Sequence, residues 1–409
     1  MITPPTDPQR VDAADVRSTN LAVVLRCVRE QAPCSRADIA AATGLNKTTV
    51  SSLVSELLKR RLLREVGMAG NRVGRPAVML TLDGASYAAI GVEVAAEHLT
   101  AIAVDLTGRT LLSWRRALPP EARTRLVTTV AALGRRVVTR ADQDGRTVLG
   151  LAVALADGTG AGPGFATDLA AALQAPTFPV EAGRGADFAV LAERRFGPHA
   201  GVADLVYLTA DPAPAAGLVL GGTPHRGSLG RSGDIAHLVV DPAGPACACG
   251  RRGCLTAVAG AAAVARRATP PGAEAVAQTK GAPVDVDQRI DAAVARAHAG
   301  DRPTLDALAA AGRDLGGGVA VLLRVLDPAV VVLGGHYAPL APWLLPGVHA
   351  VLREQEADVD GRRVVASTLG RDAAALGAAG WILDVVEGGR LPGDHLWSAA
   401  GAVQPRLLT

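Results

Sequence analysis

The segment Ser232-Gly-Asp-Ile-Ala-His237 is followed, after a short apolar run, by Cys247-Ala-Cys-Gly-Arg-Arg-Gly-Cys-Leu255, which contains three of the chain's five cysteines. Thiolate sulfur and imidazole nitrogen are the ligands that Zn²⁺ prefers, and four of them complete a closed tetrahedral site. Gly250 and Gly253 allow tight turns that would bring the last cysteine back beside the first two. The spacing therefore indicates zinc binding with His237 as the fourth ligand. In the alternative interpretation, three thiols merely lie near one another and His237 ends a strand.

This stretch also resembles a signature of the ROK family, which is named for its repressors, open reading frames and sugar kinases. The resemblance rests on Gly-Asp-Ile-Ala-His, Asp241-Pro and Cys-x-Cys-Gly-x-x-Gly-Cys-Leu, and it extends over most of the chain, from about Asn20 to about Gly389. It implies one structural zinc ion per chain. The ligands that it implies are His237, Cys247, Cys249 and Cys254.

Length and composition predict a chain of two or three domains. The 409 residues are 49% hydrophobic but only 3% aromatic, so alanine, valine and leucine must fill the cores. No stretch approaches the length of a membrane span, and residues 1–10 lack the apolar core of a signal peptide. We therefore expect a cytoplasmic protein without a membrane partner. A reducing compartment favours metal binding over disulfides for the cysteines.

Positive charge is concentrated at the N-terminus. Residues 1–83 contain 12 basic and 8 acidic side chains, whereas the rest of the chain contains 30 and 31. This asymmetry hints at a polyanionic partner for the N-terminal part. We expect a disordered lead-in over residues 1–19, a winged helix-turn-helix domain over 20–82, a ROK domain over 84–390 and a tail over 391–409.

The helix-turn-helix prediction follows from local signals. Apolar residues at helical spacing predict a helix from Asn20 that ends before Pro33. Ser35, with an acidic residue three positions on, is a good N-cap for a short second helix. The turn Thr43-Gly-Leu45 leads to a third helix capped by Asn46. Three helices with a glycine-containing turn before the last are typical of a helix-turn-helix.

Small polar and cationic side chains at the start of the third helix suit a recognition helix, although a solvated face would carry them too. Two short strands, 62–66 and 78–80, then enclose a loop rich in glycine, arginine and asparagine, which is typical of a wing. The elements Ser-Arg-Ala-Asp-Ile-Ala, Gly-Leu-Asn-Lys-Thr-Thr-Val and Gly-Arg-Pro-Ala resemble the DNA-binding domain of ROK repressors. The expected DNA contacts are Ser35, Asn46, Lys47, Thr48, Thr49, Ser51, Ser52, Arg72 and Arg75.

From Asp83 onward the pattern becomes that of an α/β fold. A predicted hairpin over 89–94 and 99–105 is followed by an amphipathic helix over 126–140 and a near-continuous apolar strand over 148–155, typical of a covered sheet. The family resemblance implies two similar lobes of the sugar kinase and actin-like ATPase type, with a ligand cleft between them.

The residues that phosphoryl transfer needs are missing from this pattern. The position of the family's first phosphate loop reads Glu93-Val-Ala-Ala-Glu97, without the glycine that lets the backbone approach a phosphate. The family's catalytic aspartate corresponds to Gly185, and its sugar-binding asparagine to Arg184. Two prolines within 210–217 remove amide donors from the second phosphate loop. We therefore expect no catalytic residue and no enzyme activity.

The leading interpretation is a DNA-binding transcriptional regulator, a repressor connected with carbohydrate metabolism, whose large domain senses an effector or dimerises. It would bind a pseudo-palindromic double-stranded operator as a homodimer or a dimer of dimers, and it would respond to a sugar or sugar derivative. One alternative is an ATP-dependent sugar kinase with an added N-terminal domain. Another is a ligand-independent repressor whose large domain only dimerises the DNA-binding heads. The expected remnants of an effector site are Arg184, Asp234 and His237.

Overall fold

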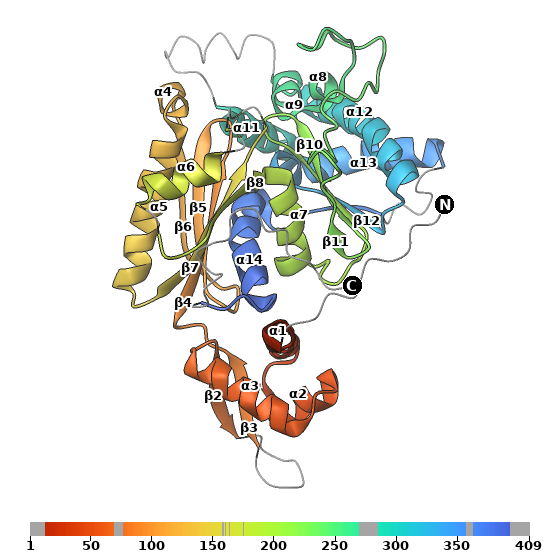
Figure 1. The fold of residues 1–409 in the computed structure, drawn as a ribbon. Coiled ribbons are helices and arrows are strands. Elements are labelled where there is room, and N and C mark those ends of the chain that lie inside the picture. The colour runs from red at the N-terminus through yellow and green to blue at the C-terminus, as the bar shows by residue number, and fades with distance from the viewer. Residues whose placement is uncertain are drawn as a thin grey trace, which may run out of the picture.

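The computed structural model describes residues 13–68, 77–157, 159, 161–162, 164–174, 176–269, 285–356 and 363–392. Figure 1 shows a small N-terminal domain attached below a large domain of two lobes. This arrangement confirms the expected combination of a helix-turn-helix domain and a kinase-like α/β domain. None of the described helices is long and apolar enough to cross a membrane.

The N-terminal domain contains three helices and a small antiparallel sheet. Its elements are α1 (Ala13–Gln31), β1 (Cys34–Ser35), α2 (Arg36–Thr43), α3 (Lys47–Lys59), β2 (Leu63–Met68) and β3 (Val78–Leu82). The strand β3 pairs with both β1 and β2. The two strands of the expected wing are thereby confirmed, whereas the loop between them lies outside the described residues.

The first helix begins earlier than expected. It starts at Ala13, inside the segment 1–19 that we expected to be disordered, while residues 1–12 are outside the described chain. The additional turns are held by distant parts of the protein. Arg17 pairs with Glu56 of α3, and the Ser18 hydroxyl donates a 2.8 Å hydrogen bond to the carbonyl of Gly389. The spacing of apolar residues within the helix cannot reveal such contacts, so the sequence did not predict the earlier start of α1.

The helix caps are those that the sequence predicts. Ser35 and Asp38 form a capping box, in which each side chain bonds the backbone amide of the other residue. Gly44 ends α2 with a left-handed φ of 72°. The Asn46 side chain caps α3 by accepting a 2.7 Å hydrogen bond from the Thr49 amide. These caps define where α2 ends and where α3 begins.

The first lobe of the large domain is built on a mixed sheet in the order β6-β5-β4-β7-β8. Its strands are β4 (Tyr87–Val94), β5 (His98–Val104), β6 (Thr110–Ala117), β7 (Thr147–Leu155) and β8 (Val180–Arg184). The helices of this lobe are α4 (Pro120–Arg123), α5 (Leu126–Gln143) and α6 (Phe165–Ala172). The strand β4 is antiparallel to β5 and parallel to β7, which confirms the predicted hairpin and buried strand.

The second lobe repeats this topology with the order β11-β10-β9-β12-β13. Its strands are β9 (Leu205–Ala210), β10 (Pro214–Leu220), β11 (Thr223–Pro224), β12 (Val330–Leu333) and β13 (Val364–Ala366). Its helices are α8 (Leu255–Ala259), α9 (Ala261–Arg267), α11 (Val286–His298), α12 (Arg302–Leu326) and α13 (Ala341–Glu354), with the short turns η1 (Gly335–Leu340) and η2 (Gly370–Asp372). In both lobes the first strand pairs antiparallel with the second and parallel with the fourth, so the lobes are similar as expected.

Two helices, α7 (Gly185–Phe196) and α14 (Ala373–Glu387), lie side by side between the two sheets (Figure 1). They pack closely enough to require glycine. A Cβ on Gly91 of β4 would lie 1.9 Å from the Ala375 carbonyl oxygen, and one on Gly377 would lie 1.8 Å from that of Phe188. After α14 the Leu391 side chain is fully buried, so the ordered chain continues into the segment 391–409 that we expected to be a tail. Residues 393–409 are outside the described chain.

Candidate functional sites

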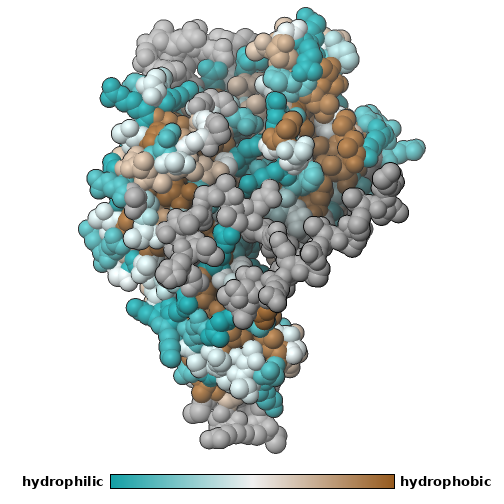
Figure 2. Space-filling model, viewed as in Figure 1, coloured by the Kyte–Doolittle hydropathy of each residue, from teal (hydrophilic) through white to brown (hydrophobic). Residues whose placement is uncertain are grey.

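The N-terminal half of α3 presents a polar, exposed face. Its apolar residues Val50, Leu53, Val54 and Leu57 are buried against the domain. In Figure 2 the α3 region of the N-terminal domain is mainly white to teal, the colours of weakly polar and hydrophilic residues. The exposed residues of the expected DNA contacts are Asn46, Lys47, Thr48, Ser51 and Ser52, and Thr49 is half-buried.

Three of the expected DNA contacts, Ser35, Arg72 and Arg75, do not lie on the described exposed face of α3. Ser35 is only 5% exposed, and its hydroxyl donates a 2.8 Å hydrogen bond to the Asp38 carboxylate. Its side chain therefore serves the capping box, and we remove Ser35 from the candidate DNA surface. Arg72 and Arg75 lie outside the described residues.

The His237, Cys247, Cys249 and Cys254 side chains converge beside α8. One ligand atom from each residue lies within 4.8 Å of all the others. The Cys247 sulfur is 3.5 Å from His237 Nδ1, and the Cys249 sulfur is 3.5 Å from that of Cys254. In a tetrahedral site with Zn–S bonds of about 2.3 Å, two sulfurs lie about 3.8 Å apart. The cluster therefore fits a zinc ion in both donor type and spacing.

Backbone turns at glycine bring these side chains together. Gly250 and Gly253 have φ values of 88° and 62°, and a Cβ on Gly253 would lie 1.5 Å from the Asp241 carbonyl oxygen. The predicted turns are thus present. His237, however, lies in a turn and does not end a strand. The segment that follows pairs only at two isolated bridges, Val239–Cys254 and Ala246–Arg252, so a regular strand does not form.

The thiols of the cluster differ in acidity. Hydrogen bonds from the backbone and side chain of Arg251 lower the pKa of Cys249 to about 6, whereas burial raises the pKa of Cys254 to about 11. Metal binding requires deprotonated thiols. A bound cation would supply the charge that stabilises the buried Cys254 thiolate.

The cleft between the lobes is nearly closed. Its cavity has a volume of about 30 Å³, comparable with the volume of one water molecule rather than of a sugar. Gly185, at the start of α7, and Arg184 both line this cavity. Asp234 and His237 are not among its lining residues. Asp234 is exposed and faces Arg231, so of the three expected effector-site residues only Arg184 lies at the cleft.

Residues from both expected phosphate-loop positions, Glu93 and Asp211, line the cleft. Glu93 is a buried carboxyl at the end of β4, and burial together with the nearby Asp211 carboxylate raises its pKa well above the usual value. On the opposite side, Pro214 pairs with Ala210 in the β9–β10 hairpin, where a proline has no amide hydrogen to donate. Pro214 therefore offers no backbone amide to a phosphate at the second loop position.

An ion network centred on Asp287 holds the lobes together. One Asp287 oxygen lies 2.6 Å from His98 Nε2 of the first lobe, and the other lies 2.7 Å from His336 Nε2 of the second. The Arg115 guanidinium also contacts Asp287. Burial opposes the charge on Asp287, but hydrogen bonds from His336 and His98 lower its pKa well below the usual range. Sequence reasoning missed this network because its members come from segments far apart in the chain. The only local signal was His336, which directly follows two glycines.

The geometry defines the class of protein: a helix-turn-helix DNA-binding regulator with a duplicated α/β domain. The sequence model of the IclR helix-turn-helix domain matches residues 19–67, and that of the ROK family matches residues 89–385. The chain belongs to the ROK family.

Similar proteins support both parts of this assignment. A xylose repressor of Bacillus spizizenii is 26% identical over 91% of this chain and 98% of its own length. An N-acetylglucosamine repressor of Escherichia coli is 25% identical over 83% of this chain and 86% of its own length. The crystal structure of a ROK family transcriptional regulator, a homologue of the E. coli MLC protein, has the same fold with a TM-score of 0.71, at 21% identity and coverage of 91% and 97%. A ROK family glucokinase from Streptomyces griseus, solved with glucose and AMPPNP, covers 72% of this chain and 98% of its own, with 25% identity and a TM-score of 0.58.

Proposed function

We propose that this protein is a repressor that binds a pseudo-palindromic operator as a homodimer or a dimer of dimers. The observation that carries the proposal is the exposed polar N-terminal half of α3 in a domain with correctly capped helices. A recognition helix places these first turns against base edges in the major groove. Asn46, Lys47, Thr48, Ser51 and Ser52 would face the DNA from α3, and Arg72 and Arg75 would reach it from the loop between β2 and β3.

The large domain would act as a sensor and dimerisation domain without catalysis. Gly185 has no side chain to serve as a base for a sugar hydroxyl. The names of the similar repressors suggest a sugar or sugar derivative as effector and genes of carbohydrate metabolism as targets. Such an effector would bind a more open arrangement of the lobes, with Arg184 as one of its contacts.

Zinc would have a structural role. With four protein ligands the coordination sphere is complete, which leaves no open position for a substrate. The ion would link the turn at His237 to the glycine-rich loop and to Cys254, the N-cap residue of α8. Its contribution would be to the folding of this region.

Two experiments test the proposal. Selection of genomic fragments with the purified protein should yield a palindromic site, and the genes beside it would identify the effector class. A failure to enrich any site would contradict the repressor assignment.

Titration with Mg-ATP, together with a coupled kinase assay over a sugar panel, tests the alternative that the protein is a sugar kinase. Micromolar affinity for ATP or sugar-dependent turnover, in the protein or in Gly185→Asp, would reinstate the enzyme interpretation.

A further inference from the structure

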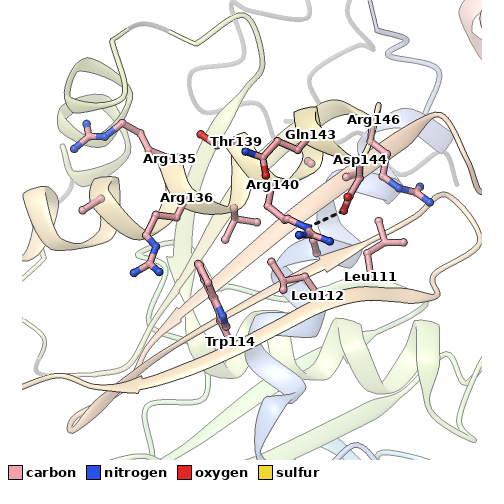
Figure 3. Close-up of a pocket in the computed structure, with 15 residues that line it drawn as sticks. Leu111, Leu112, Trp114, Arg135, Arg136, Thr139, Arg140, Gln143, Asp144 and Arg146 are labelled. Carbon is pink, nitrogen blue, oxygen red and sulfur yellow. Dashed lines mark hydrogen bonds and ion pairs between the residues drawn. The ribbon is translucent and has the colours of Figure 1, made fainter.

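The elements α5 and β6 lie at the outer edge of the first lobe (Figure 1), and residues of both line a large groove (Figure 3). Its volume is about 760 Å³, which falls in the range of small-molecule sites, about 300–1,000 Å³. The interlobe cavity of about 30 Å³ is far smaller. In this structure the groove, unlike the interlobe cavity, is therefore large enough for a small organic ligand.

The groove combines an apolar floor with a cationic rim. The floor comes from α5 and from the strands β4, β5 and β6, and it includes Ala88, Ala103, Leu111, Leu112, Trp114 and Val137. The rim contains four arginines, Arg135, Arg136, Arg140 and Arg146. Asp144 is the single carboxylate among the lining residues. A floor of this kind favours an apolar or aromatic body, and the excess of arginine favours negative charge.

Arg136 is the rim residue best placed for a ligand. Its guanidinium carbon lies 4.4 Å from the centroid of the Trp114 ring, and Figure 3 shows the two side chains facing one another from α5 and β6. The other arginines are engaged. Arg135 donates to the Ala172 carbonyl at 2.8 Å, and Arg140 donates to Asp144 at 3.1 Å. Among the described residues no hydrogen bond or ion pair is found for Arg136.

We propose that this groove binds a small amphipathic organic anion. The flat or apolar body packs on Trp114 and the leucine floor, and a carboxylate, sulfonate or phosphate group accepts hydrogen bonds from Arg136. Arginine donors bind such groups through two parallel hydrogen bonds, which orients the ligand as well as attracting it. This site is separate from the interlobe cleft and from the proposed sugar effector.

The end of the groove adjoins the connection between the domains. Arg146 donates hydrogen bonds to the carbonyl oxygens of Gly84, at 2.8 Å, and Tyr87, at 3.2 Å. The Tyr87 hydroxyl in turn donates a 2.6 Å hydrogen bond to the Arg60 carbonyl, at the end of α3. A ligand in the groove therefore lies beside the segment that carries the DNA-binding domain.

The site can be tested with two matched fluorescent dyes, anilinonaphthalene sulfonate and its uncharged analogue phenylnaphthylamine. We expect one saturable site per chain and at least about tenfold tighter binding of the sulfonate. Arg136→Gln should weaken sulfonate binding about tenfold and leave the neutral dye unaffected. Trp114→Leu should weaken both dyes. Arg353→Gln, an exposed arginine of α13, makes the same change in net charge and should have no effect.

Circular dichroism and thermal melting show whether each variant is folded, and both substituted side chains are partly or fully exposed, so we expect folded proteins. Equal affinities for the two dyes, or unchanged sulfonate affinity in Arg136→Gln, would overturn the proposal. Displacement of the dye by an oligoglutamate peptide, but not by naphthalene sulfonate, would also overturn it and would assign the groove to an acidic protein segment.

Discussion

The Arg29 guanidinium of α1 lies 2.6 Å from the Glu387 carboxylate of α14. The same carboxylate contacts Arg195, near the C-terminal end of α7, whose first residue Gly185 lines the interlobe cleft. The helix α7 thus extends from the cleft to the ion pair between α1 and α14. A change in the cleft that moves α7 would reach α1 through Glu387.

Removal of the Glu387 charge should destabilise the protein more than removal of the Arg29 charge. The side chains of Glu387 and Arg195 are each 8% exposed, so Glu387→Gln leaves a buried guanidinium with less compensation, at a cost of about 3 kcal/mol. Arg29 is 34% exposed, and Arg29→Gln should cost less than about 1 kcal/mol. Urea unfolding followed by circular dichroism measures both. Equal losses of unfolding free energy in the two variants would contradict the conclusion that the buried Glu387–Arg195 pair is the more important contact.

Lys47→Ala should weaken operator binding, because Lys47 lies exposed in the first turn of α3. Lys59→Ala, at the other end of the same helix, is the control with the same change in charge. If Lys47 contacts only phosphate, its loss should reduce the salt slope by about one without altering sequence preference. Arg75→Ala should behave in the same way if the loop reaches the backbone. Unchanged affinities of Lys47→Ala and Arg75→Ala in gel shifts at fixed salt would exclude this docking.

Metal analysis should find one zinc ion per chain. Cys249→Ser removes one of the four converging ligands and should lower both the zinc content and the melting temperature. Cys27→Ala, which removes a thiol of α1 outside the cluster, should leave the zinc content unchanged. A protein purified without chelator that is fully folded and free of metal would refute the assignment.

The Asp287 network should make stability depend on pH. Burial opposes protonation of His336, but the hydrogen bond to Asp287 raises the pKa of His336 above its ordinary value. The stabilisation of the folded state by protonated His336 is therefore complete below about pH 6.5, and it is lost as pH rises through the higher pKa of the folded state. The pKa of Asp287 is lowered, so its carboxylate stabilises the folded state above about pH 3.9. This stabilisation is lost only as pH falls through the much lower pKa of the folded state.

Thermal melting of the protein and of His336→Gln across pH 5 to 9 tests this dependence. We expect the melting temperature of the unmodified protein to fall more steeply above about pH 6.5 than that of the variant. The other side chains that contact Asp287 in the described chain are the His98 imidazole and the guanidinium groups of Arg115 and Arg371. Parallel pH profiles would show that His336 does not carry the effect.

Much of the local structure could be predicted because its signals lie within short segments. The capping box at Ser35 and Asp38, the left-handed Gly44 and the buried stripe of α3 are each specified by neighbouring residues. The convergence of the cysteines was also local, since Gly250 and Gly253 provide the turns. The role of Ser35 could not be predicted in the same way, because a polar residue at a helix start can satisfy a cap as readily as it contacts DNA, and here it caps α2.

The sequence by itself determined the helix-turn-helix, the α/β pattern and the cysteine-histidine cluster, since caps, periodicity and glycine turns act over a few residues. Only the tertiary structure decided that the cleft is closed, that Asp287 joins the lobes and that Arg29 meets Glu387. It also decided that Arg136 stacks on Trp114 above a groove. These contacts join residues far apart in the chain, and their geometry depends on how whole helices and sheets pack.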